Sequence, residues 1–331
     1  MIKNLHEKIY EKERIFLSQY AMHSEDSRGR LKEEPPCPMR TDFQRDRDRI
    51  IYSKAFLRLK NKTQVFFAPD GDHYMSRLTH TFGVSQIARS LARCLDLNED
   101  LTEAIALGHD LGHTPFGHIG ERVLDRLCPA GFKHSEQSLR VVDVLEKDGK
   151  GLNLTFEVRD GILNHTRRGN PATLEGQAVS IADRIAYINH DIEDAIRAGF
   201  LRAEELPEEA IRVFGKNTSE RIETAILDIV SESSGQPYVR MSPEKQRALD
   251  DLRAFMFEHV YEKANILIQE SAERMLSALY TYFMDRPEEM PAVYRAGSDV
   301  PRAVCDYLSS MSDRYAINTF KRLFVPKEGS V

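Results

Sequence analysis

The spacing of apolar residues is the feature of this sequence that most restricts its fold. Along most of the chain, apolar residues recur at steps of three and four, as they do on one face of a helix. The clearest stripe lies between Gln177 and Ala198, where five isoleucines follow one another at steps of four, three, four and four: Ile181, Ile185, Ile188, Ile192 and Ile196. No run of alternating β-branched residues is long enough to build a sheet. We therefore predict an all-α fold.

Three further helices are expected in the first half of the chain. One helix begins at Thr81 and carries the apolar stripe Val84, Ile87, Ala88, Leu91 and Leu95. The next runs from about Asp100 to Leu111, and Gly112 is predicted to close it as a left-handed cap. Thr114-Pro115 is expected to start another helix, because proline suits the first helical turn.

The composition is that of an ordinary globular chain. Its 331 residues contain 30% charged and 41% hydrophobic residues, with no apolar run near the roughly 20 residues that a membrane span needs. The N-terminus lacks the apolar segment of a secretory signal, so we expect a soluble cytoplasmic protein. The four cysteines form no CxxC pair, which predicts reduced thiols rather than a zinc site or a disulfide framework.

Histidine and aspartate are arranged as in a metal site. His109 and Asp110 are adjacent, a pair that also occurs on solvated helix surfaces, but His80 precedes it by 29 residues and Asp183 follows it by 73. Because each lies on its own expected helix, three helices can bring these side chains to one cation. Two imidazoles and two carboxylates make a borderline-hard site suited to Mn, Fe, Ni, Zn or Mg. We expect Mn²⁺ or Mg²⁺, with Fe, Ni, Zn or Co as alternatives. The open coordination positions indicate catalysis rather than a structural site.

A longer set of motifs surrounds these four residues. Its pieces are SRGR (27–30), RTDFQRDRDRI (40–50), LRLKNKTQVF (57–66), SRLTHTFGV (76–84), ALGHDLGHTPFGHIGE (106–121), KHSEQS (133–138) and ADRIAYINHDIED (182–194). Over roughly residues 27 to 200 the chain resembles the deoxyguanosinetriphosphate triphosphohydrolase-like family of the HD-domain phosphohydrolases. Leu57 departs from the resemblance, because the family often has a basic residue there.

The resemblance implies a domain organisation. We expect an N-terminal helix and linker at residues 1–39, an HD catalytic core at 40–200, and a C-terminal helical region at 201–331 that packs on the core. It also implies a homo-oligomer, although the pattern of the C-terminal helices fixes no number of subunits.

The resemblance assigns roles to residues beside the metal ligands. His118 and Glu121 are three apart, so they share a helix face and can couple as a proton donor and its orienting group; the family's catalytic residues map to this pair. The resemblance also implies four substrate contacts. Arg77 would bind the α-phosphate and Arg184 the phosphate tail. His113 would contact phosphate or the outer shell of the metal ion, and His134 would lie in the pocket. For His165 the sequence leaves a phosphate contact and a structural hydrogen bond equally open.

A deoxyribose site is implied by similarity as well. Asp183, Tyr187 and Asp191 repeat every four residues on the face opposite the isoleucine stripe. Tyr187 would pack where a ribose 2′-hydroxyl would clash, and Asp191 with Gln64 would bind the 3′-hydroxyl. A steric block combined with an unpaired hydroxyl discriminates strongly between sugars.

The expected activity is hydrolysis of deoxynucleoside triphosphates, dGTP or several dNTPs, to the deoxynucleoside and inorganic triphosphate. One alternative is an HD phosphodiesterase or nucleotidase that acts on another nucleotide, since metal ligands alone do not select a substrate. A second is a binding module for single-stranded nucleic acid or an activating dNTP, built on a possible effector or anion site: Arg40, Arg45, Arg47, Arg49 and Arg58. The net charge of −6 argues against general affinity for nucleic acid.

Overall fold

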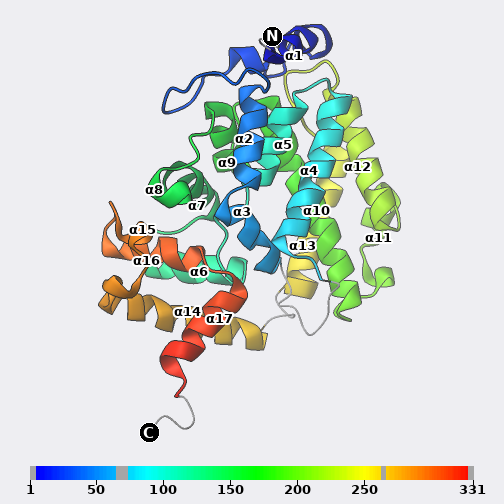
Figure 1. Cartoon of the computed structure of the whole chain (residues 1–331). Helices are drawn as coiled ribbons and strands as arrows, with labels where there is room; N and C mark the ends of the chain where they lie inside the picture. Colours follow the sequence, from blue (N-terminus) through cyan, green and yellow to red (C-terminus); the bar gives the residue numbers. More distant parts are fainter. Residues whose placement is uncertain (1–4, 65–73, 262–265, 327–331) are drawn as a thin grey trace.

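The computed structural model describes residues 5–64, 74–261 and 266–326, and within these ranges the chain forms helices and no strand. The all-α prediction is therefore confirmed (Figure 1). No helix in these ranges is long and apolar enough to cross a membrane. The α-helices are α1 (Leu5–Phe16), α2 (Asp42–Ile51), α3 (Lys54–Arg58), α4 (Arg77–Cys94), α5 (Glu99–Gly108), α6 (His118–Leu127), α7 (His134–Arg140), α8 (Glu146–Gly149), α9 (Phe156–Asn164), α10 (Leu174–Arg197), α11 (Glu208–Phe214), α12 (Thr218–Ser233), α13 (Pro243–Met256), α14 (Ile266–Asp285), α15 (Ala292–Arg295), α16 (Val300–Ser309) and α17 (Asp313–Phe324).

Helix α10 is the longest helix and runs through the larger of two hydrophobic cores. Its isoleucine stripe is buried from Ile181 to Ile192, whereas Ile196 near its end is partly exposed. Helices α4, α5, α9 and α12 pack around it, as Figure 1 shows for the upper part of the molecule. The predicted stripe thus faces the core as expected.

A second hydrophobic core joins the C-terminal helices to α6. Phe116, Val123 and Leu124 from the α6 region are buried together with Leu276 and Leu279 of α14, and residues of α16 and α17 complete the cluster. In Figure 1 these helices form the lower part of the molecule, and α14 packs directly on α6. Helix α6 therefore belongs to the C-terminal core, although it lies in the middle of the sequence.

The same core contains a disulfide that the sequence did not predict. Cys128, which directly follows α6, is bonded to Cys305 of α16 across 177 residues of sequence. Both cysteines are buried. The expectation of four reduced thiols is wrong for this pair, because two thiols so far apart in the chain form no recognisable motif and meet only when α6 packs on α16.

The segment between α5 and α6 also differs from the prediction. Helix α5 ends at Gly108 rather than near Leu111, and α6 begins at His118 rather than at Pro115. Gly112 does not have the left-handed conformation of a cap. A Cβ atom at this position would lie 2.2 Å from the backbone nitrogen of Ser138, so glycine is required here by the close approach of α7.

Candidate active site

A cavity of about 570 Å³ lies where the two hydrophobic cores meet. Its wall contains the side chains that the sequence assigned to catalysis and to the substrate: Gln64, Arg77, His113, His118, Glu121, His134, Arg184, Tyr187 and Asp191. Three of the four expected metal ligands, His80, Asp110 and Asp183, line it as well. The fourth, His109, lies within 4 Å of Asp110 and Asp183. The structure therefore gathers residues from α4, α6, α7, α10 and the α5–α6 segment into one site.

The four expected metal ligands converge. His80 is in the first turn of α4, whose start is set by the Ser76 capping box, while His109 and Asp110 lie in the turn that follows α5. The Nε2 atom of His80 lies 3.1 Å from Oδ1 of Asp183, and Nε2 of His109 lies 3.5 Å from Oδ1 of Asp110 and 3.8 Å from Oδ1 of Asp183. Ligand atoms of His80, His109 and Asp110 all lie within 4.8 Å of one another. This His/Asp cluster has the spacing of a metal site.

The hydrogen bonds of His109 prepare it for a cation. Its Nδ1 atom donates to the carbonyl oxygen of Ala106 at 2.7 Å, which leaves the lone pair on Nε2. Nε2 is buried and has no hydrogen-bond partner in the described part of the chain. An unpaired buried acceptor is costly, and a bound cation would satisfy it. The donor set of two imidazoles and two carboxylates thus fits a divalent metal ion.

Arg77 stabilises the charge of the cluster. Its Nη1 donates to Oδ2 of Asp110 at 2.7 Å, and both side chains are buried. Burial raises the pKa of Asp110, but the neighbouring His109, His113 and Arg77 lower it more, so the net pKa is well below the ordinary value. Asp183 behaves similarly: burial opposes ionisation, while the hydrogen bond with His80 and the neighbouring His109 lower its pKa to about 2. Both carboxylates are ionised at neutral pH.

A second group of side chains lies beside the cluster, around Glu121. One carboxylate oxygen of Glu121 lies 3.2 Å from Nδ1 of His118, and the other accepts hydrogen bonds from the backbone nitrogen and Nδ1 of His134, each at 2.8 Å. Burial raises the pKa of Glu121, but its bonds to the two histidines lower it further than burial raises it. Glu121 is therefore an ionised acceptor that orients both imidazoles.

His134 is held between two acceptors. Besides Glu121, its Nε2 faces Nε2 of His165 at 3.2 Å. Because His165 donates from Nδ1 to the Ile162 carbonyl, its Nε2 is an acceptor, and His134 donates from both ring nitrogens. Burial lowers the pKa of His134, yet Glu121 raises it above the ordinary value, whereas burial lowers the pKa of His165 to about 4. His165 thus makes two hydrogen bonds within the protein and also lines the cavity, so a phosphate contact stays a prediction beside the structural role.

At the other end of the cavity, two residues that the sequence analysis missed hold the expected sugar contacts. Arg253 of α13 donates from Nε to the hydroxyl oxygen of Tyr187 at 3.0 Å, and the Tyr261 hydroxyl donates to Asp191. Burial is the main reason that the pKa of Asp191 rises to about 8. Arg253 and Tyr261 come from the C-terminal part of the chain, where no motif marked them.

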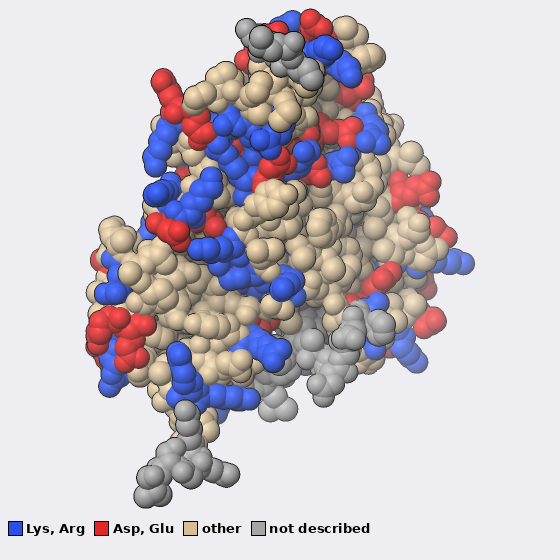
Figure 2. Space-filling model, viewed as in Figure 1, with Lys and Arg blue, Asp and Glu red and all other residues tan. Residues whose placement is uncertain are grey.

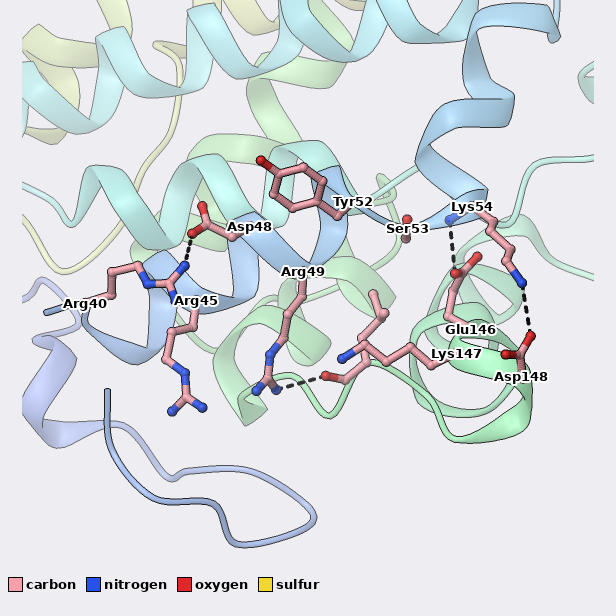
Figure 3. A pocket seen from close by; sticks show the side chains of 11 residues that line it. Arg40, Arg45, Asp48, Arg49, Tyr52, Ser53, Lys54, Glu146, Lys147 and Asp148 are labelled. Carbon is pink, nitrogen blue, oxygen red and sulfur yellow. Dashed lines mark hydrogen bonds and ion pairs between the residues drawn. The ribbon is translucent and has the colours of Figure 1, made fainter. Parts of the chain in front are cut away.

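The arginine-rich segment lies on a separate surface. Arg40, Arg45 and Arg49 line a second cavity of about 450 Å³ between α2 and α8, and Figure 3 shows Lys54 and Lys147 on its opposite side. Each arginine already has an internal partner: Arg40 pairs with Asp48, and Arg45 and Arg49 share Glu34. A ligand would have to compete with these ion pairs. Figure 2 shows acidic and basic side chains interleaved on this face.

The other two arginines of that predicted effector site lie elsewhere. Arg47 turns toward α5, where its Nη1 pairs with Asp100 at 2.9 Å and with Glu103 at 3.2 Å. Arg58 does not line this cavity, but its Nη2 lies 3.8 Å from Oε1 of Glu146, which does. The structure therefore brings three of the five residues to one cavity.

Two family models match separate parts of the chain. The HD domain family model matches residues 77–188, and the model described as a phosphohydrolase-associated domain matches residues 239–322. A deoxyguanosinetriphosphate triphosphohydrolase-like protein of Caldanaerobacter subterraneus subsp. tengcongensis is 57% identical, covering 94% of this chain and 93% of that protein. A protein with the same description from Desulfatibacillum aliphaticivorans is 46% identical, with 97% and 98% covered. A crystal structure of a hypothetical protein from Aquifex aeolicus is 21% identical with a TM-score of 0.49, over 84% of this chain and 71% of that one.

Proposed function

Because this chain belongs to the deoxyguanosinetriphosphate triphosphohydrolase-like family of HD-domain phosphohydrolases, we propose that it hydrolyses deoxynucleoside triphosphates to the deoxynucleoside and inorganic triphosphate. One observation carries the proposal. A single cavity places the His/Asp cluster beside the His118–Glu121 pair and extends from there to Tyr187 and Asp191. Its volume of about 570 Å³ is in the range of small-molecule sites.

The phosphates would bind at the end of the cavity that contains the His/Asp cluster. His80, His109, Asp110 and Asp183 would hold a divalent ion, which when bound would stabilise negative charge on the phosphoryl oxygens as a Lewis acid. Arg77 is already fixed by Asp110, so its remaining N–H groups are oriented toward the cavity at no further entropic cost. Arg184 lies one residue after Asp183, lines the same cavity and would bind the phosphate tail.

His118 is the proposed general acid. In the proposed reaction a water oxygen bonds to the α-phosphorus, the bond from this phosphorus to the 5′-oxygen breaks, and the 5′-oxygen takes a proton from Nε2 of His118. The attacking water releases one proton to solvent, and the exposed His118 takes one proton back from solvent, so the numbers of protons balance. Glu121 accepts from Nδ1 of His118, which turns Nε2 outward to the cavity. His134 fixes the other oxygen of Glu121, so the acid and its orienting carboxylate have defined positions.

The sugar end supports a preference for deoxyribose. Arg253 holds the Tyr187 hydroxyl, so the ring cannot easily turn away from a ribose 2′-hydroxyl. Asp191, with its partner Tyr261, and Gln64 offer hydrogen-bonding groups to the 3′-hydroxyl. A rigid aromatic wall and buried polar groups are the features that discriminate between hydroxyl patterns.

The test is product analysis with the His118→Ala variant. The wild-type protein, incubated with each dNTP singly and in mixtures under Mn²⁺ or Mg²⁺, should release deoxynucleoside and triphosphate. The variant should lose about 100- to 10 000-fold in kcat, the usual contribution of a general acid, while binding nucleotide as the wild type does. Release of only monophosphate or orthophosphate would refute the proposed reaction, and unchanged turnover in the variant would refute the role of His118.

A further inference from the structure

The proposed acid and the metal cluster belong to different halves of the molecule. The expected metal ligands lie on α4, on the turn that follows α5 and on α10, and the apolar faces of these three helices contribute to the larger core. In contrast, α6, which begins with His118, is buried with residues of α14 and α16 in the second core. Catalysis requires the two groups to be placed to within a fraction of an ångström of their productive geometry. The position of one core relative to the other must therefore be fixed close to His118 and the metal cluster.

The segment that leads into α6 is conformationally strained. Phe116 has a φ of +61° and Gly117 a φ of +54°, and a non-glycine residue in this region is uncommon. A Cβ atom at Gly117 would lie 3.0 Å from the Gln64 carbonyl oxygen and 3.2 Å from Nη2 of Arg77. The backbone of this turn therefore packs closely on two residues that line the cavity. Strained backbone persists only where neighbouring groups hold it.

Asp313, the first residue of α17, holds this turn from the C-terminal half. Its Oδ1 accepts a hydrogen bond from the backbone nitrogen of Phe116 at 2.9 Å. Its Oδ2 accepts from the backbone nitrogen and the hydroxyl of Thr63, at 2.8 and 2.6 Å. The carboxylate is buried, makes no ion pair among the described residues, and is favoured by the N-terminus of its own helix. Both of its oxygens thus accept hydrogen bonds, one from the Phe116 backbone and the other from the backbone and side chain of Thr63.

Lys62 makes the complementary connection. Its side-chain nitrogen Nζ is buried and donates to the carbonyl oxygen of His113 and, at 2.7 Å, to that of Ser309, the last residue of α16. Burial lowers the pKa of Lys62 well below its ordinary value. A buried donor must keep its acceptors, so these two hydrogen bonds connect the His113 and Ser309 carbonyl groups. Lys62 and Asp313 therefore tie both ends of the 113–116 turn to the α16–α17 corner.

We propose that Asp313 is a positioning residue of the active site, which, together with Lys62, sets the place of His118 relative to the metal cluster. The proposal rests on the proposed function of His118. It assigns the matched phosphohydrolase-associated region a direct part in the geometry of the site rather than only in stability. Asparagine cannot replace the carboxylate, because it has one acceptor oxygen, and its amide group would face a donor N–H.

The experiment compares Asp313→Asn, His118→Ala and the double variant, all as full-length protein. Asp313→Asn should lower kcat by about ten- to a hundredfold, as misplacement by an ångström does, with metal content unchanged. In the His118→Ala background the same substitution should cost no more than about twofold, because both changes remove one function. Asp228→Asn is the matched control, since Asp228 is also a little-exposed carboxylate with a backbone donor, Ser242, far from α6. It should leave kcat unchanged.

Hydrogen–deuterium exchange gives a readout that does not depend on turnover. Peptides covering residues 113–121 should exchange at least about tenfold faster in Asp313→Asn, as expected for loss of a hydrogen bond to a charged group, while peptides from α4 and α5 keep their rates. Unchanged exchange, or losses in kcat that simply multiply in the double variant, would overturn the inference. If His118→Ala itself retains full activity, the proposed function fails instead, and the exchange rates still decide whether Asp313 holds the turn.

Discussion

The contact between Gly112 and α7 makes a sharp prediction for Gly112→Ala. The added Cβ would lie 2.2 Å from the backbone nitrogen of Ser138 and 2.7 Å from the carbonyl oxygen of His134. Both are backbone atoms, so no side-chain rotation can make room, and α7 must move away by more than an ångström. The hydroxyl of Ser138 bridges this contact, because it accepts from the nitrogen of Gly112 at 2.9 Å and donates to the carbonyl oxygen of His109 at 2.7 Å.

The expected cost has two parts. Overpacking in a close-packed interior costs about 1–3 kcal/mol. The two hydrogen bonds of Ser138 contribute about 1 kcal/mol each, and both break when α7 moves. Gly112→Ala should therefore lower the free energy of unfolding by about 3–5 kcal/mol. It should also weaken metal binding, because His109 loses the bond that holds its carbonyl group.

Urea denaturation and metal titration measure both effects. Ser138→Ala is the first control, since it removes the two hydrogen bonds without a clash and should cost about 2 kcal/mol. Gly199→Ala is the second, because Gly199 has a φ of +76° with no atom near its absent Cβ, and only the conformational cost of about 1–2 kcal/mol applies. If Gly112→Ala is as stable as the wild type, or costs no more than Ser138→Ala, the close approach does not constrain this position.

Three further outcomes are expected. The pKa of Asp191 is about 8 in the folded protein and about 3.9 in the unfolded chain. Between these pH values the folded state binds one proton more than the unfolded chain. The free energy of unfolding should therefore fall by about 1.4 kcal/mol for each pH unit of increase. Asp191→Asn should remove this slope in urea titrations from pH 5 to 9, and an unchanged slope would contradict the assignment. Chelation of divalent ions should lower Tm, and Mn²⁺ at a hundred times its Kd should restore about 2.7 kcal/mol, a response that Asp183→Asn should lack. The double variant Cys128→Ser with Cys305→Ser should lose about 2–4 kcal/mol; equal urea midpoints with and without reductant in the wild type would argue against the disulfide.

The fold class and the His/Asp cluster were predictable from the sequence because their evidence is local. A stripe such as Ile181 to Ile192 follows from the helical repeat, and the apolar face must be buried wherever the helix packs. The spacing of His80, the His109–Asp110 pair and Asp183 lies within motifs that can be read along the chain. The family membership that these motifs implied is confirmed by relatives matching nearly the whole chain.

Other features depend on contacts between residues distant in the sequence. Gly112 was expected to be a helix cap, but the reason for glycine there is α7, which follows more than twenty residues later. Arg253 and Tyr261 line the cavity, and Asp313 bonds to the Phe116 turn beside it. All three come from a region in which the sequence showed no motif, because hydrogen bonds to buried acceptors need position but no periodic pattern. The sequence by itself determined which helices form and which residues can hold a metal ion. Only the tertiary structure decided that α6 packs with the C-terminal helices, because burial of its apolar face depends on partners 150 or more residues away.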